Sequence, residues 1–145
     1  MTSTTAAQPR RTGYPGYTLK GRRAPETAEE GRCLVRVALA AWGLADEAET
    51  AALIMSELVA NAARHARGHT IRMTVNRPVD NRVYVAVIDR APLKVPTMLT
   101  PGPDAVQGRG LLLVDAVSHQ WGWEYMGTGT RPWGKRVWAT LAVAP

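Results

Sequence analysis

A change of hydrophobic period in the middle of the chain restricts the fold more than any other feature of this sequence. From residue 46 to about residue 67, apolar residues recur every three to four positions, which predicts an amphipathic helix closed by Gly68. Apolar and polar residues then alternate over 71–76, and 83–88 is a continuous apolar run, so two strands are expected there, the second buried on both faces. Strands separated by a short turn pair antiparallel, and the helix is expected to bury its apolar side on the resulting sheet or on another helix.

The remaining elements extend the same two-layer arrangement. Tyr17 to Lys20 is expected to be a short edge strand, and a helix is expected to open at Pro25 and end at Gly43. A long Pro-rich loop covers 90–107; a third helix is expected over 111–117, and two last strands over 120–125 and 137–143. This order predicts an α+β two-layer sandwich, with two or three helices on one face of a mostly antiparallel sheet of four or five strands.

Length and composition favour one soluble, cytoplasmic domain. The chain has 145 residues, which is the usual size of a single domain, and we assign the domain to residues 17–145. Residues 1–16 are expected to form a flexible basic tail, because they have no apolar periodicity. No apolar run is long enough for a membrane span, and the single cysteine, Cys33, is expected to be a core residue of the first helix in a reducing compartment.

The positive charge of the chain is concentrated at its N-terminal end. The formal net charge is +6, but residues 1–23 hold five basic and no acidic residues. The rest of the chain is nearly neutral, whereas nucleic-acid-binding domains usually carry a basic face on the folded body. Direct binding of nucleic acid is therefore not expected, although the tail keeps it as a third alternative.

The helix over 46–67 carries one polar ridge that is a candidate for chemistry. Glu57 and Asn61 lie one turn apart and share a side with Arg64 and His65, opposite the apolar arc. Such a ridge is either a solvated helix face or a carboxylate and an amide that hold a hydrated cation and orient a water molecule.

Two further candidates follow the strands. Asp89 ends the most apolar strand, where it is either a turn residue or a polar anchor that accepts a hydrogen bond from an exocyclic amine, as in adenine. Gly108, Arg109, Gly110 and Leu111 precede or open a helix, where free backbone amides suit a phosphate; the alternative is a plain loop-to-helix junction. The three histidines lack the spacing of a metal site, so a site made only of protein side chains is not expected.

In this order the segments resemble the nucleotide-binding boxes of the GHKL ATPases, the superfamily of gyrase, heat-shock chaperone, histidine kinase and MutL type. Residues 56–66 (SELVANAARHA) look like the N box, and 108–111 (GRGL) look like the second glycine box. Residues 87–89 look like the strand end that opens the first glycine box, and 134–138 (GKRVW) resemble the closing strand. The short layout is most similar to bacterial anti-sigma-factor serine kinases of the actinobacterial type.

The resemblance implies a Bergerat fold that binds ATP with Mg²⁺. It implies that Asn61 holds the Mg²⁺, that Glu57 acts as base or water-orienting acid, and that Asp89 accepts a hydrogen bond from the adenine amino group. The backbone of 108–111 would hold phosphates, with Arg64 and His65 near them. Two positions depart from the pattern: Arg90-Ala91-Pro92-Leu93 replaces the glycines of the first box, and Lys135 replaces the closing-strand threonine.

The leading functional hypothesis is an ATP-binding regulator of the anti-sigma type. Such a protein sequesters a sigma factor and phosphorylates serine or threonine on a small antagonist protein, and relatives suggest a homodimer. The alternative is a non-catalytic protein-interaction module on the same fold with weak or lost nucleotide binding, which the altered first glycine box favours.

Overall fold

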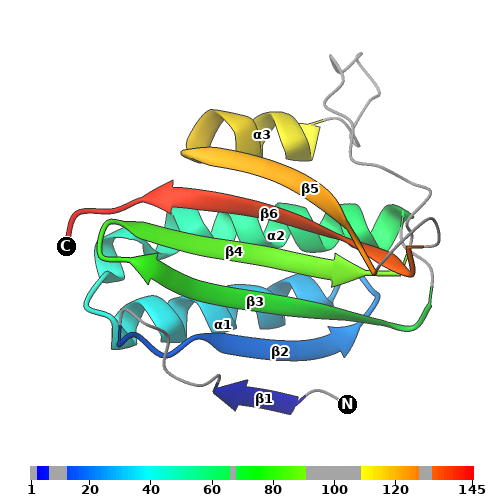
Figure 1. Ribbon diagram of the computed structural model, residues 1–145, viewed down its shortest axis with the longest axis horizontal. Coiled ribbons are helices and arrows are strands. Elements are labelled where there is room, and N and C mark those ends of the chain that lie inside the picture. The colour runs from blue at the N-terminus through cyan, green and yellow to red at the C-terminus, as the bar shows by residue number, and fades with distance from the viewer. Residues whose placement is uncertain (1–2, 7–12, 66–67, 91–108, 128–131) are drawn as a thin grey trace.

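The computed structural model describes residues 3–6, 13–65, 68–90, 109–127 and 132–145. Within them the chain forms one six-stranded sheet in the order β1-β2-β3-β4-β6-β5, and every neighbouring pair is antiparallel (Figure 1). The helices are α1 (Thr27–Ala41), a short 3₁₀ turn (Ala45–Glu47), α2 (Ala48–His65) and α3 (Arg109–Val117). The strands are β1 (Ser3–Ala6), β2 (Tyr17–Arg22), β3 (Thr70–Val79), β4 (Arg82–Asp89), β5 (Gln120–Met126) and β6 (Gly134–Ala142).

The two long helices cover one face of the sheet, and the opposite face carries no helix among the described residues. In Figure 1, α1 and α2 lie behind β2, β3, β4 and β6, and α3 lies beside β5. This arrangement confirms the predicted α+β sandwich. The sheet has one strand more than expected, because β1 adds to the edge of β2.

The core lies between the sheet and the two long helices. Alternate residues of β4, namely Val83, Val85 and Val87, are buried toward α2, as their cross-strand partners in β3 and β6 are. From α2, the buried Leu58 and Val59 meet this face. Each such side chain contributes roughly 1.5–3 kcal/mol when it is fully buried, so the alternation over these strands fixes which face meets the helices.

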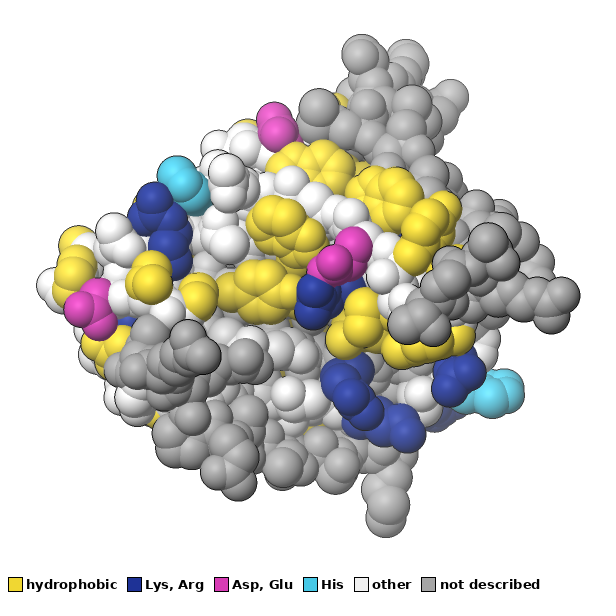
Figure 2. Space-filling view, viewed as in Figure 1, with side chains coloured by type: hydrophobic (Ala, Val, Ile, Leu, Met, Phe, Trp, Pro, Cys, Tyr) yellow, Lys and Arg dark blue, Asp and Glu magenta, His cyan; other side chains and the backbone are white. Residues whose placement is uncertain are grey.

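The other face of β4 is less buried than its apolar sequence predicts. Ala86 is buried, but Tyr84 and Ile88 are only half-buried, so the prediction of a strand buried on both faces is wrong in part. Trp138 of β6 stacks on Tyr84, with ring centroids 6.3 Å apart. Side chains shield this face in place of a helix layer, and Figure 2 shows apolar side chains in yellow along it.

The N-terminal region is more structured than expected. The prediction that residues 1–16 lack stable structure is wrong for Ser3–Ala6, which pair with β2 as strand β1. Ladder bonds use the backbone alone, so the free edge of β2 can recruit a segment without apolar periodicity. Nearer the domain, the Tyr14 hydroxyl donates to Asp80 Oδ1 at 2.6 Å, which raises the pKa of Tyr14, and the Arg77 guanidinium lies 4.2 Å from the centre of its ring.

The orientation of α1 corrects one expectation. Cys33 is exposed, and its sulfur lies 3.7 Å from Glu29 Oε1, so the prediction of a core cysteine is wrong. The buried stripe of α1 runs through Leu34, Val35 and Leu39, and this rotates Cys33 out of the interface. None of the described helices is long and apolar enough to cross a membrane.

Candidate functional site

Four element ends meet at one end of the sandwich, the right-hand end in Figure 1. These are the C-terminal end of α2, the C-terminal end of β4, the start of α3 and the start of β6. The helix α2 contacts β4, β6 and α3 directly. The fold therefore brings together the segments that carry the predicted site residues, although they are far apart in the sequence.

The α2 ridge is not a fully solvated helix face. Asn61 is buried at 5% exposure and Glu57 is half-buried, while Arg64 is exposed. They lie on the second half of α2, whose apolar side packs on the sheet. Amide and carboxylate oxygens are the side-chain ligands that Mg²⁺ takes in proteins, and one or two of them suffice when substrate phosphates complete the shell.

The start of α3 provides backbone donors at the same end of the fold. The helix begins at Arg109, so the amides of Arg109, Gly110 and Leu111 belong to its first turn and have no intrahelical partner. Leu111 is buried at 3% exposure and anchors this turn against the core. Gly108 and the predicted 90–107 loop from residue 91 onward lie outside the described residues.

The floor of the site holds a buried ion pair. Lys135 Nζ donates to Asp89 Oδ1 at 3.0 Å, and both side chains are fully buried. The two residues are direct cross-strand partners in β4 and β6, and both point toward the helix side of the sheet. Asp89 is therefore an interior anchor, and the reading of Asp89 as a turn residue is wrong.

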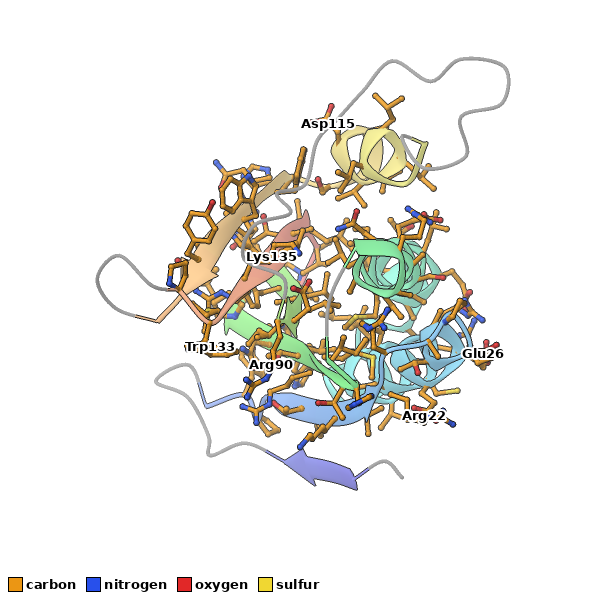
Figure 3. The ribbon with its side chains drawn as sticks, turned by 90° about the vertical axis from the view of Figure 1, so that its right-hand side faces the viewer. Arg22, Glu26, Arg90, Asp115, Trp133 and Lys135 are labelled. Atoms are coloured by element: carbon orange, nitrogen blue, oxygen red, sulfur yellow. The ribbon has the colours of Figure 1, made fainter. Side chains whose placement is uncertain are left out.

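Gly134 allows β6 to pass close to this floor. A Cβ built on Gly134 would lie 2.0 Å from the Asp89 carbonyl oxygen, so no other residue fits without moving the backbone. Figure 3 looks toward this end of the molecule, with Lys135 between the sheet and α2. The glycine and the ion pair together fix how the two strands meet beneath the site.

The two ends of the site fit a magnesium nucleotide differently. Asn61, Glu57 and the first turn of α3 supply oxygen ligands and amide donors suited to a metal-bound polyphosphate. Among the described residues, no three His, Cys, Asp or Glu side chains come together. At the Asp89 end of the site, where an adenine base is expected, Asp89 Oδ1 already accepts a hydrogen bond from Lys135. This bond would compete with one from the adenine amino group.

The ion pair was not predicted, although the sequence contains a signal for it. Lys135 occupies the same phase as Val137 and Ala139 in an alternating strand, and Asp89 continues the phase of Val85 and Val87. A lysine and an aspartate in the buried phase of two strands satisfy each other when the strands are neighbours. Strand order was needed to find the pair, and the pattern of either strand alone does not give it.

Comparison with known proteins assigns the family. The model of the histidine kinase-like ATPase domain matches residues 22–141, which is most of the chain. The chain therefore belongs to the histidine kinase-like ATPase domain family, within the GHKL superfamily. Domains of this family bind ATP with Mg²⁺ and are common in anti-sigma-factor serine kinases. No curated protein matches the chain.

Proposed function

We propose that this protein is a cytoplasmic, Mg-ATP-binding regulator of the anti-sigma type that phosphorylates serine or threonine on a small antagonist protein and sequesters a sigma factor. The observation that carries the proposal is the burial of Asn61 on α2, one turn from Glu57, where β4 ends and α3 begins. Membership of the histidine kinase-like ATPase domain family supports it. By the same resemblance, we propose that the protein works as a homodimer.

In this proposal the residues of the chain position Mg-ATP and remove the proton from the hydroxyl group that is phosphorylated. Bound Mg-ATP would supply the transferable phosphoryl group. Asn61 would hold the metal, and the amides at the start of α3 would hold phosphate oxygens. Glu57, which is half-buried on α2, accepts the proton of the incoming hydroxyl.

Calorimetry and a transfer assay test the proposal directly. The intact protein is titrated with Mg-ATP and Mg-ADP, and phosphoryl transfer to a co-encoded small antagonist is measured with labelled ATP. We expect saturable binding that needs Mg²⁺, and transfer that needs Glu57. If the wild-type protein shows neither Mg-ATP binding nor phosphoryl transfer, the proposed kinase activity is rejected.

A second function is a non-catalytic interaction module, and the Asp89–Lys135 ion pair favours it. Lys135 donates to Asp89 Oδ1 from within the protein, so this oxygen has a donor when no nucleotide is bound. This alternative predicts that the sigma factor or antagonist binds equally well with and without Mg-ATP. Partner affinity measured in both conditions separates the two functions.

A further inference from the structure

A pocket of about 320 Å³ opens on the sheet face that the helices leave uncovered. Its walls include Lys20 of β2, Arg72 of β3, Ile88 of β4 and, just beyond the strand, Arg90. Lys20, Arg72 and Ile88 are cross-strand partners, and each follows a residue that is buried toward the helices. The pocket is therefore on the opposite side of the sheet from Asn61 and α3.

Three cations converge on this pocket. Lys20 and Arg72 lie directly opposite each other on β2 and β3, and Arg90 lines the same space. All three side chains are exposed. Figure 2 shows basic side chains in dark blue grouped at this part of the face, beside apolar ones. Like charges directly opposite in a sheet are destabilising, so the arrangement costs stability unless an anion lies between them.

Three arginines elsewhere on the surface are paired with acids, and the three cations of this pocket are not. Arg32 binds Glu29, Arg36 bridges to Glu49, and Arg136 binds Glu124. In the part of the chain that the structure describes, Lys20, Arg72 and Arg90 form no ion pair.

The pocket contains one acid, Asp89, whose carboxylate points to the other side of the sheet and binds Lys135. The positive charge of the pocket is therefore not balanced from within its walls.

An apolar wall adjoins the cations. Trp133 is 46% exposed, and the Arg90 guanidinium lies 5.6 Å from the centre of its ring. Met126 completes this side of the pocket. Figure 3 shows Arg90 and Trp133 side by side at the sheet end, away from the side chain of Lys135. A ligand here would meet charge on one side and an aromatic surface on the other.

We propose that this pocket is a second binding site, which takes a phosphate group. The site lies on the other face of the sheet from Asn61 and the start of α3, although Asp89 borders both, and it does not depend on the function proposed above. A phosphomonoester carries about −1.5 to −2 charges and three acceptor oxygens, which suits three cations better than a singly charged carboxylate does. The pocket volume is within the range of small-ligand sites. The phosphate comes either from a phosphorylated side chain or from a small phosphate compound.

Titrations followed by amide NMR test the site with defined probes. The probes are inorganic pyrophosphate and O-phosphoserine, with serine as the unphosphorylated control. We expect shifts at residues 20, 70–72 and 88–90 with one or both phosphate probes, and none with serine. Arg72→Gln should weaken binding by about tenfold or more, because a charge-assisted hydrogen bond is lost. Arg36→Gln, which removes one charge from α1, should have no effect.

The variants also report whether Arg72 has only a structural role. Without ligand, Arg72→Gln should be at least as thermally stable as the wild type, because a repulsion with Lys20 is removed. Lys20→Gln provides a second variant if Arg72→Gln does not fold. A shift with O-phosphoserine alone supports a phosphorylated side chain, and a shift with pyrophosphate alone supports a small compound.

Equal binding by wild type, Arg72→Gln and Lys20→Gln would overturn the proposal. So would shifts confined to Asn61 and the start of α3, because the phosphate would then occupy the candidate nucleotide site. The absence of shifts with both phosphate probes would overturn it as well.

Discussion

At one end of the candidate nucleotide site, α2 presents Asn61 and Glu57 next to the first turn of α3; at the other end, Asp89 binds Lys135 in the interior. The first end holds Asn61 and Glu57, to which the resemblance assigns metal and phosphate chemistry. At the second end Lys135 and Arg90-Ala91-Pro92-Leu93 stand where the resemblance implies a threonine and the glycines of the first box. We call them the phosphate end and the base end.

The two ends of the site are therefore under different physical constraints. The polar groups of the phosphate end, namely Asn61, Glu57 and the amides of α3, are proposed to bind a ligand, so we expect them to matter more for chemistry than for folding. The base end is a desolvated ion pair, and removing either charge would leave the other buried without its ion-pair partner, so we expect the pair to matter for the folded state. Substitutions at the base end should therefore change stability, and substitutions at the phosphate end should change chemistry.

The largest effect is expected for Lys135→Met. The variant keeps the length of the side chain and leaves the carboxylate of Asp89 buried without its cation, which should lower the free energy of unfolding by about 3–5 kcal/mol. Urea unfolding measures the loss. Arg36→Met, which removes an exposed cation, is the matched control and should change the midpoint far less.

A double variant separates the pair from its surroundings. Asp89→Leu combined with Lys135→Met replaces both charges with apolar groups, and it should regain much of the stability that Lys135→Met loses. Equal stability of wild type and Lys135→Met would contradict the importance of the ion pair. A double variant less stable than Lys135→Met would contradict the cost of an unpaired Asp89.

Glu57→Gln tests the phosphate end. The substitution keeps the shape of the side chain and removes the proton acceptor, so phosphoryl transfer should fall by about a hundredfold or more. Mg-ATP affinity and the urea midpoint should change little, because the role of Glu57 belongs to the transition state. Transfer at the wild-type rate would remove Glu57 from the mechanism.

Asn61→Ala tests whether Asn61 coordinates Mg²⁺. A methyl group cannot coordinate a hard cation, so the gain in ATP affinity that Mg²⁺ provides should disappear. Calorimetry with Mg²⁺ and with a chelator measures this gain in both proteins. The ATP affinity measured without Mg²⁺ is the internal control. It should stay within about twofold of the wild-type value, which is well below the tenfold change that corresponds to about 1.4 kcal/mol of binding free energy. An undiminished Mg²⁺ effect would contradict the assignment.

The sequence predicted the fold better than it predicted the site. Hydrophobic spacing predicted the three α-helices and five of the six described strands, because alternation and helical spacing are set by local burial. β1 was missed because its pairing uses backbone groups only. Cys33 was placed wrongly because α1 has small residues on both sides, so spacing alone did not fix which side faces the sheet.

The candidate site was also predicted only in part from the sequence. The resemblance named Asn61, Glu57 and Asp89, and the structure places their elements at one end of the sandwich. The partner of Asp89 depends on strand order, which brings β6 beside β4 although Asp89 and Lys135 are 46 residues apart. The basic pocket likewise depends on the pairing of β2 with β3, and neither strand shows it alone.

The smallest change in stability is expected when an exposed ion pair is removed, in contrast to the buried ion pair at the base end. Arg36 of α1 reaches Glu49 of α2, with Nε 3.0 Å from Oε1, and this contact lowers the pKa of Glu49 below its usual value. A carboxyl group with a lowered pKa in the folded state stabilises the fold above its unfolded pKa. This contribution is lost as the pH falls through the folded pKa.

Glu49→Gln should therefore unfold at a slightly lower urea concentration than the wild type near neutral pH, and the two curves should converge as the pH falls below about 4. Salt should shrink the difference as well, because the pair is exposed. The deficit of Lys135→Met should persist in salt, because its pair is buried. A Glu49→Gln deficit that survives both acid and salt would show that Glu49 acts by something other than its charge, and the contrast between exposed and buried pairs would fail.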